Sequence, residues 1–136
     1  MTRIALDASV LIYFVEGSDT LRERIVRRLD CIRADPAGCV IASRIARMEC
    51  RVKPLRDANV RLLSEYEAVF EAERFILADV TSTVLDRAAD LRARHRFKTP
   101  DAIHLATAVE ASADVFLTGD VALAKCGDLK VEVFAP

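Results

Sequence analysis

The chain has 136 residues, of which 52% are hydrophobic and 30% charged, and its formal net charge is −1. This composition is typical of one globular domain and excludes a disordered chain, and it does not by itself indicate a nucleic-acid-binding protein. No apolar run reaches the length of a membrane span, and the first one lacks the flanks of a signal peptide, so we expect a cytoplasmic protein without a membrane partner. The four cysteines form no C-x-x-C pair and have no histidines at metal-ligand spacing, which argues against a zinc site.

The apolar pattern predicts strands that alternate with helices. Four runs are apolar without polar alternation, as in strands buried on both faces, and a fifth is typical of a short edge strand. The expected strands are residues 3–7, 39–42, 75–77, 115–117 and 131–134. The expected helices are residues 9–14, about 20–33, 44–53, 57–72, 81–95 and 100–109. We therefore expect an α/β fold, a single three-layer domain of residues 1–136 with a mostly parallel central sheet of about four to five strands flanked by helices.

Polar residues and a proline set the predicted limits of two helices. Ser9 is placed to cap the first helix and Ser43 the third, because serine hydroxyls accept hydrogen bonds from free N–H groups at helix starts. Pro54 is expected to end the third helix, since proline removes a backbone hydrogen bond.

Four acidic residues stand out by position: Asp7, Glu49, Asp101 and Asp120. Asp7 and Asp120 follow buried strands, and Asp101 falls in the first turn of its helix. Glu49 falls in what we expect to be the sheet-facing stripe of the third helix. The carboxyl ends of parallel strands and the helix starts that follow them share one edge of the sheet, so these carboxylates are expected to converge there.

Each acid also has a structural explanation. Asp7 and Asp120 could cap the helices that follow them, and Asp101 suits the positive end of its helix dipole. Glu49 could pair with an arginine such as Arg47 or Arg51. Clustered carboxylates repel one another, however, and a divalent cation would relieve that repulsion. Oxygen ligands without a His/Cys set favour Mg²⁺ or Mn²⁺ over zinc.

The stripe that carries Glu49 is defined by Ile45, Met48 and Val52. Burial of a carboxylate among these side chains would be costly without a cation nearby, which favours a site role for Glu49.

Two neutral polar residues lie close in sequence to these acids. His104 follows Asp101 by three residues, which allows either a metal ligand or a side chain that packs beside the site. Thr118 precedes Asp120 by two residues and could orient a water or a phosphate oxygen, although a threonine at a strand end is also unremarkable.

Four segments together resemble the PIN domain, and most of all the VapC-type ribonuclease toxins. They are IALDASVLI from Ile4, Ser43 followed by Glu49, TPDAIHLATA from Thr99, and LTGD ending at Asp120. The resemblance covers essentially the whole chain, and the order and spacing of the four acids make it specific.

The resemblance implies a Mg²⁺- or Mn²⁺-dependent ribonuclease whose catalytic and metal-binding residues are Asp7, Glu49, Asp101 and Asp120. Thr118 matches a hydroxyl that commonly precedes the last acid of the family, and we assign Thr118 and Ser9 supporting roles. A VapB-type antitoxin and a homodimer are implied as partners. Some members carry a fifth acid shortly after the fourth, but residues 121–126 contain none, which argues against a firmly held second metal.

Cations near the site would bring in RNA phosphates, and the candidates are Arg47, Lys53, Arg56 and Lys98. Residues 1–56 carry 11 Lys/Arg against 7 acidic residues, which is consistent with a local phosphate-binding face but also with solvated helix faces.

Two alternatives stay open. A catalytically inactive PIN-like module could bind RNA or a protein partner, although such a module would not need all four acids. A phosphoacceptor receiver domain would need paired acids after the first strand and an acceptor after the third, where Asp79 is the sole candidate.

Overall fold

The computed structural model describes residues 1–134 and 136, and its centre is a five-stranded parallel sheet. The strands are β1 (Arg3–Leu6), β2 (Cys39–Ser43), β3 (Phe75–Ala78), β4 (Val115–Thr118) and β5 (Val131–Val133). Their order across the sheet is β3-β2-β1-β4-β5, and every pair of neighbours is parallel. The five predicted strands are confirmed, and the sheet is wholly parallel.

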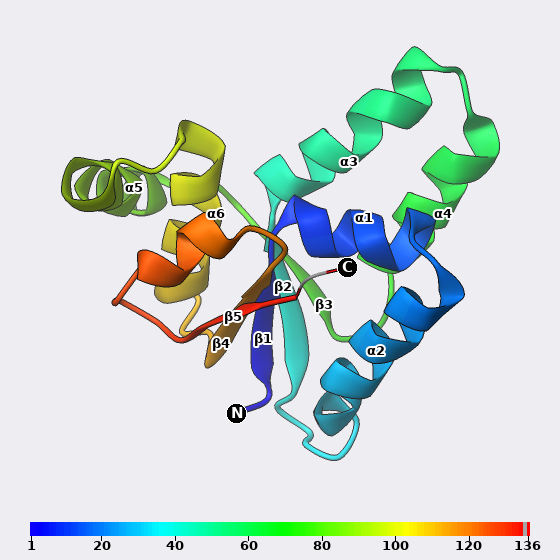
Figure 1. Ribbon diagram of the computed structural model, residues 1–136, viewed down its shortest axis with the longest axis horizontal. Coiled ribbons are helices and arrows are strands. Elements are labelled where there is room, and N and C mark those ends of the chain that lie inside the picture. Colours follow the sequence, from blue (N-terminus) through cyan, green and yellow to red (C-terminus); the bar gives the residue numbers. More distant parts are fainter. Residues whose placement is uncertain (135) are drawn as a thin grey trace.

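Helices cover both faces of the sheet, which confirms the three-layer α/β prediction (Figure 1). They are α1 (Ala8–Glu16), α2 (Asp19–Leu29), α3 (Arg44–Arg56), α4 (Val60–Phe70), α5 (Ser82–His95) and α6 (Thr99–Glu110), with short 3-10 helices η1 (Asp30–Ile32) and η2 (Val121–Lys125). α5 and α6 pack on one face, and α1, α2 and α4 on the other. α3 and α4 extend past the carboxyl ends of the strands. Within the described chain, no helix is both long enough and apolar enough to cross a bilayer.

β1 contributes to two separate cores because alternate side chains of a strand point to opposite faces. Ile4 and Leu6 belong to the core under α1, α2 and α4, and Ala5 belongs to the core under α5 and α6. Burial on both faces explains why the sequence of this strand is continuously apolar.

Asp7 and Ser43 cap the helices that begin at the carboxyl ends of β1 and β2. Asp7 caps α1 in place of the predicted Ser9: its side chain accepts a hydrogen bond from the Val10 N–H, and the helix starts two residues earlier than a cap at Ser9 would place it. Ser43 caps α3 as predicted, through a 3.1 Å bond from the Ala46 N–H to Oγ. A carboxylate is as good a cap as a hydroxyl, and here it stands at the strand end itself.

The prediction that Pro54 ends α3 is wrong. The helix continues through Pro54 to Arg56, because a proline in the last turn removes a single hydrogen bond from a helix that ends two residues later. Pro54 is also buried, so its ring contributes to packing.

The predicted buried face of α3 is wrong for two of its three residues: Ile45 packs against the core under α5 and α6, but Met48 and Val52 do not. Met48 and Val52 are 52% and 53% exposed, and the buried residues are Ala46, Cys50 and Pro54. Both sets recur with helical spacing. The smaller side chains of the second set let α3 approach its neighbours closely, and the larger ones remain outside.

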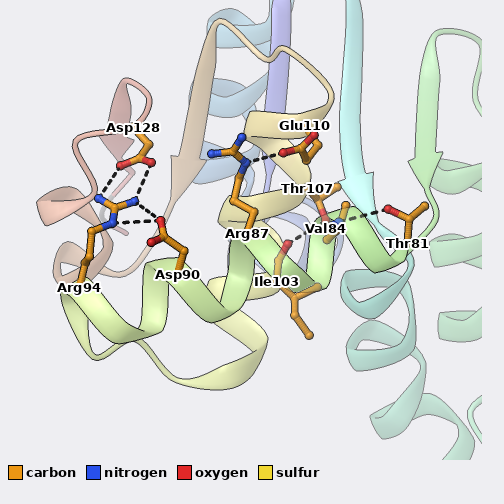
Figure 2. A network of polar contacts seen from close by, with 9 residues as sticks. All are labelled: Thr81, Val84, Arg87, Asp90, Arg94, Ile103, Thr107, Glu110 and Asp128. Atoms are coloured by element: carbon orange, nitrogen blue, oxygen red, sulfur yellow. Dashed lines mark hydrogen bonds and ion pairs between the residues drawn. The ribbon is translucent and has the colours of Figure 1, made fainter.

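Ion pairs connect α5 to α6 and to the loop after η2 (Figure 2). Arg94 bonds both Asp90 on its own helix and Asp128 in the loop after η2, each at 2.8 Å. Arg87 pairs with Glu110 at the end of α6. Of these pairs, Arg87–Glu110 links α5 to α6, the helix that carries Asp101 and His104.

Candidate active site

The candidate site lies where the strand order reverses. β2 and β3 lie on one side of β1, and β4 and β5 lie on the other. Leu6 pairs with Leu117 across β1 and β4, so Asp7 and Thr118 emerge side by side at the carboxyl edge. Such a reversal is the usual ligand position in parallel α/β sheets, because the connecting helices diverge there and leave a crevice.

Asp7 is held by hydrogen bonds on both carboxylate oxygens. Oδ1 accepts from the Ser9 hydroxyl at 2.5 Å and from the Val10 N–H at 3.3 Å, and Oδ2 accepts from the Thr118 hydroxyl at 2.5 Å. The residue is only 5% exposed. These three donors compensate the burial of the carboxylate, and two of them are the hydroxyls of Ser9 and Thr118, the residues to which the sequence assigned supporting roles.

The two hydroxyls connect Asp7 to the loop after β4. The Gly119 N–H donates to Ser9 Oγ at 2.9 Å, and the Asp120 N–H donates to Thr118 Oγ1 at 3.0 Å. Gly119 has no room for a side chain, because a Cβ there would collide with the ring of Tyr13. The close approach of this loop to α1 therefore favours the glycine of the LTGD segment, since a larger residue would displace the Tyr13 ring.

Asp120 is exposed and caps η2 through a 2.9 Å bond from the Ala122 N–H to Oδ1. The predicted short helix after Asp120 is thus confirmed. The remaining oxygen of Asp120 has no hydrogen-bond donor among the residues that the structure describes.

Glu49 reaches α6 rather than an arginine. Its Oε1 lies 2.6 Å from His104 Nε2, and His104 Nδ1 lies 2.8 Å from Ser43 Oγ. Its side chain is 36% exposed, so the expectation that Glu49 lies in a buried apolar stripe is wrong. The arginine pairing considered above is also wrong, because Arg47 and Arg51 both bond Glu67, at 2.9 and 2.6 Å.

The pKa of Asp101 responds to the charges of the other three acids. The pKa of Asp101 is raised above its ordinary value, first by burial; nearby His104 opposes this rise, and the charges of Asp120, Asp7 and Glu49 add to it. Each of these acids therefore lies close enough to disfavour a charge on Asp101.

The donor atoms suit a hard divalent cation, because all are carboxylate oxygens at one edge of the sheet. Within residues 1–134 and 136, however, no group of three or more His, Cys, Asp or Glu side chains is placed to hold a metal ion. Asp7, Glu49 and Asp120 each bond partners of their own in this conformation.

Comparison with known proteins decides the family. The PIN domain family model matches residues 4–129. The chain belongs to the PIN domain family. No curated protein matches it by sequence.

Solved structures that resemble this chain include VapC toxins and VapBC complexes. A chain of VapBC2 from Rickettsia felis, bound to a promoter DNA fragment, superposes with a TM-score of 0.79 at 13% identity, covering 96% of this chain and 98% of that one. VapBC-1 from nontypeable Haemophilus influenzae gives 0.75 at 15% identity, covering 97% and 98%. VapC20 from Mycobacterium tuberculosis, described as a sarcin-ricin loop cleaving toxin, gives 0.69 at 19% identity, covering 91% and 95%. At these identities the likeness establishes the fold.

Three of the four cations predicted to bind substrate in this PIN domain have ion-pair partners in the described structure. They lie on α3 and form the pairs Arg47–Glu67 (2.9 Å), Lys53–Glu16 (2.7 Å) and Arg56–Asp57 (3.1 Å). Lys98 is exposed at the start of α6 and has no ion-pair partner among the described residues.

Sequence reasoning missed Glu16 at the end of α1. Its carboxylate accepts hydrogen bonds from Lys53 Nζ and from the hydroxyl of the buried Tyr66. Burial raises its pKa, but these two bonds outweigh burial and the net shift is downward. Glu16 joins α1 to α3 and α4 through these bonds, and no local sequence pattern signals it, because its two partners lie 37 and 50 residues away.

The PIN topology does not suit the receiver-domain alternative. Asp79 follows β3, an edge strand that β2 separates from β1. Its carboxylate bonds Arg44 at 2.5 Å, so it does not share a pocket with Asp7.

Proposed function

We propose that this PIN domain is a metal-dependent ribonuclease and the toxin of a VapBC-type pair. The observation that carries the proposal is the gathering of four acids at the carboxyl edge, where Asp101 has a raised pKa because of burial and the charges of the other three. Family membership and the VapC-like fold support it, as does the RNA-cleaving activity named for the VapC20 structure.

Mg²⁺ or Mn²⁺ would be held by Asp7, Glu49, Asp101 and Asp120. A cation bound there would make a water more acidic and stabilise the charge on the leaving oxygen of a phosphodiester. Binding would require Asp120 and Glu49 to change rotamer or share their oxygens, since each now bonds another group.

The residues of the chain have separate tasks in this proposal. Asp7, fixed by Ser9 and Thr118, provides a preorganised negative charge. Asp101, partly buried in the first turn of α6, would contribute a second carboxylate, and a carboxylate oxygen that the cation does not use can take a proton from the attacking water.

RNA phosphates would first meet Lys98, whose ammonium is exposed and unpaired within the described residues. Arg56 and Lys53 are 66% and 57% exposed, and ion pairs of exposed side chains are weak, so these two could exchange their carboxylates for phosphates. Arg47 shares the half-buried Glu67 with Arg51 and is a poorer candidate.

The partners of the proposed toxin are an RNA substrate, a VapB-type antitoxin and a second copy of the chain, and its compartment is the cytoplasm. The structural neighbours that are VapBC complexes support the antitoxin. Co-purification of the chain with the product of the adjacent upstream reading frame tests this part of the proposal.

A catalytically inactive PIN-like binding module remains the second candidate. The observation in its favour is that no metal-holding group of three or more side chains is assembled within the described residues.

RNA cleavage by the purified chain separates the two functions. Wild type should cleave RNA with Mg²⁺ or Mn²⁺ and not with EDTA. Asp7→Asn should fold but not cleave, because the amide retains the shape and loses the charge. Asp79→Asn is the matched control, since this acid follows a strand of the same sheet outside the site. Cleavage that survives in Asp7→Asn, or no metal-dependent cleavage in wild type, would contradict the nuclease.

A further inference from the structure

A buried histidine joins the start of α3 to the acidic site. His104 is 4% exposed, and its two ring nitrogens face two residues of the α3 segment. Nδ1 lies 2.8 Å from the Ser43 hydroxyl, and Nε2 lies 2.6 Å from Glu49 Oε1. Both nitrogens are therefore occupied within the protein.

The hydrogen-bond directions follow from what each group can do. A carboxylate only accepts, so Nε2–H donates to Glu49. In the neutral imidazole Nδ1 then accepts, and Ser43 donates its hydroxyl hydrogen to it. Ser43 Oγ meanwhile accepts from the Ala46 N–H at 3.1 Å. With these directions, both ring nitrogens and the Ser43 hydroxyl are hydrogen-bonded within the protein.

The order Ser43–His104–Glu49 has the residue types of a hydrolytic triad, but the serine cannot act as a nucleophile. Ser43 is 1% exposed, and its oxygen also caps α3. The solvent-facing end of the network is Glu49, whose side chain is 36% exposed. The effect of the hydrogen bonds from Ser43 to His104 and from His104 to Glu49 is therefore to orient the Glu49 carboxylate.

We propose that His104 is a positioning residue that holds the Glu49 carboxylate at the edge of the acidic site, with Ser43 fixing the ring. This inference rests on the proposed nuclease function and names a residue on which its metal site depends. A glutamate on a helix has several free torsions, and fixing them before a cation arrives lowers the entropic cost of binding. Asp7 has two hydroxyls for this purpose, whereas His104 is the only hydrogen-bond partner of the Glu49 carboxylate among the described residues.

Substitutions of His104 should change the metal affinity according to whether they keep a hydrogen-bond donor for Glu49. His104→Ala frees Glu49, and loss of a residue that orients a metal ligand typically costs about 10- to 100-fold in metal affinity or activity. His104→Gln places an N–H donor at about the distance of Nε2 from the backbone and so keeps a partner for Glu49, and it should restore most of the affinity. A purely space-filling role would not separate these two variants by hydrogen bonding.

Thr107→Val is the matched control. Thr107 lies on the same helix, is buried, and donates its hydroxyl hydrogen to the Ile103 carbonyl at 2.7 Å (Figure 2). The substitution removes a buried hydrogen bond from α6 without touching any acid of the site.

The test is Mn²⁺ binding to the purified full chain, followed by electron paramagnetic resonance of the free ion, alongside single-turnover RNA cleavage with Mn²⁺. We expect a dissociation constant for Mn²⁺ at least about 10-fold higher in His104→Ala than in wild type. His104→Gln and Thr107→Val should stay within about threefold of wild type. In the Glu49→Gln background, His104→Ala should have no further effect, because its action passes through Glu49.

Wild-type Mn²⁺ affinity and cleavage in His104→Ala would overturn the inference. So would an equal loss in His104→Gln, or additive effects of His104→Ala and Glu49→Gln, since His104 would then act independently of Glu49. If His104→Ala does not fold, His104→Asn replaces it, because its amide ends short of the Nε2 position. A wild type that neither binds Mn²⁺ nor cleaves RNA would instead overturn the proposed function, and the inference with it.

Discussion

Thr118 donates its hydroxyl hydrogen to Asp7 Oδ2 at 2.5 Å across two neighbouring strands, 111 residues apart in sequence. Thr118 is fully buried, and its oxygen also accepts from the Asp120 N–H. One hydroxyl thereby links the acid after β1 to the backbone of the acid after β4.

Thr118→Val should destabilise the protein and slow cleavage. The substitution conserves shape but leaves Asp7 Oδ2 and the Asp120 N–H without this partner, and an unsatisfied buried polar group costs about 1–3 kcal/mol. Urea unfolding measures the loss, and Thr118→Ser, which keeps the hydroxyl, should recover most of it. Equal stability of wild type and Thr118→Val would show that this hydrogen bond contributes nothing.

Asp101→Asn should stabilise the metal-free protein at pH 7.5. Because burial raises the pKa of Asp101, the folded state binds more protons than the unfolded state between the ordinary pKa and the raised one. Stability is therefore lost as the pH rises through that interval, and it stays lost above it. The asparagine removes this penalty.

Thermal unfolding in EDTA and in millimolar Mn²⁺ measures both parts of this prediction. In EDTA the variant should melt above wild type, whereas Mn²⁺ should raise the melting temperature of wild type more than that of Asp101→Asn. Identical wild-type curves in Mn²⁺ and EDTA would refute cation binding under those conditions.

Lys98→Gln should weaken RNA binding in a salt-dependent manner. Each lost contact to a single-stranded phosphate lowers the slope of log affinity against log salt by about 0.7. Binding of a short RNA to Asp7→Asn protein at several salt concentrations measures this slope without cleavage. Lys130→Gln is the control, because Lys130 precedes β5 at the opposite edge of the sheet. An unchanged slope in Lys98→Gln would exclude a phosphate contact at Lys98.

One cysteine should react with a thiol reagent in the native protein. Cys31 is exposed, whereas Cys39, Cys50 and Cys126 are buried. Burial raises the pKa of the Cys50 thiol to about 12, with further contributions from Glu49, Glu16 and Asp7, so almost no reactive thiolate forms at pH 8. Titration with Ellman's reagent should show one fast thiol that disappears in Cys31→Ser, and all four in urea. Two or more fast thiols in the native wild type would contradict the described burial.

The sequence by itself determined the strands and the fold class, and it singled out four acids by their positions relative to the predicted strands and helices. A strand buried on both faces must be continuously apolar, so β1 was recognisable from its residues alone. An acid directly after such a strand, as at Asp7, cannot be explained as ordinary solvent exposure. The Ser43 cap was predictable for a different reason: the free N–H groups at a helix start need a nearby acceptor.

Only the tertiary structure decided which faces and partners these residues have. The sequence of α3 has two sets of apolar residues at helical spacing, Ala46 with Cys50 and Met48 with Val52. The first set is buried and the second is exposed, and this choice depends on how closely α3 packs against its neighbours. The partner of Glu49 is 55 residues away on α6, and the partner of Thr118 is at the other end of the chain. Such contacts depend on strand order, which places β1 beside β4, and no local pattern carries that order.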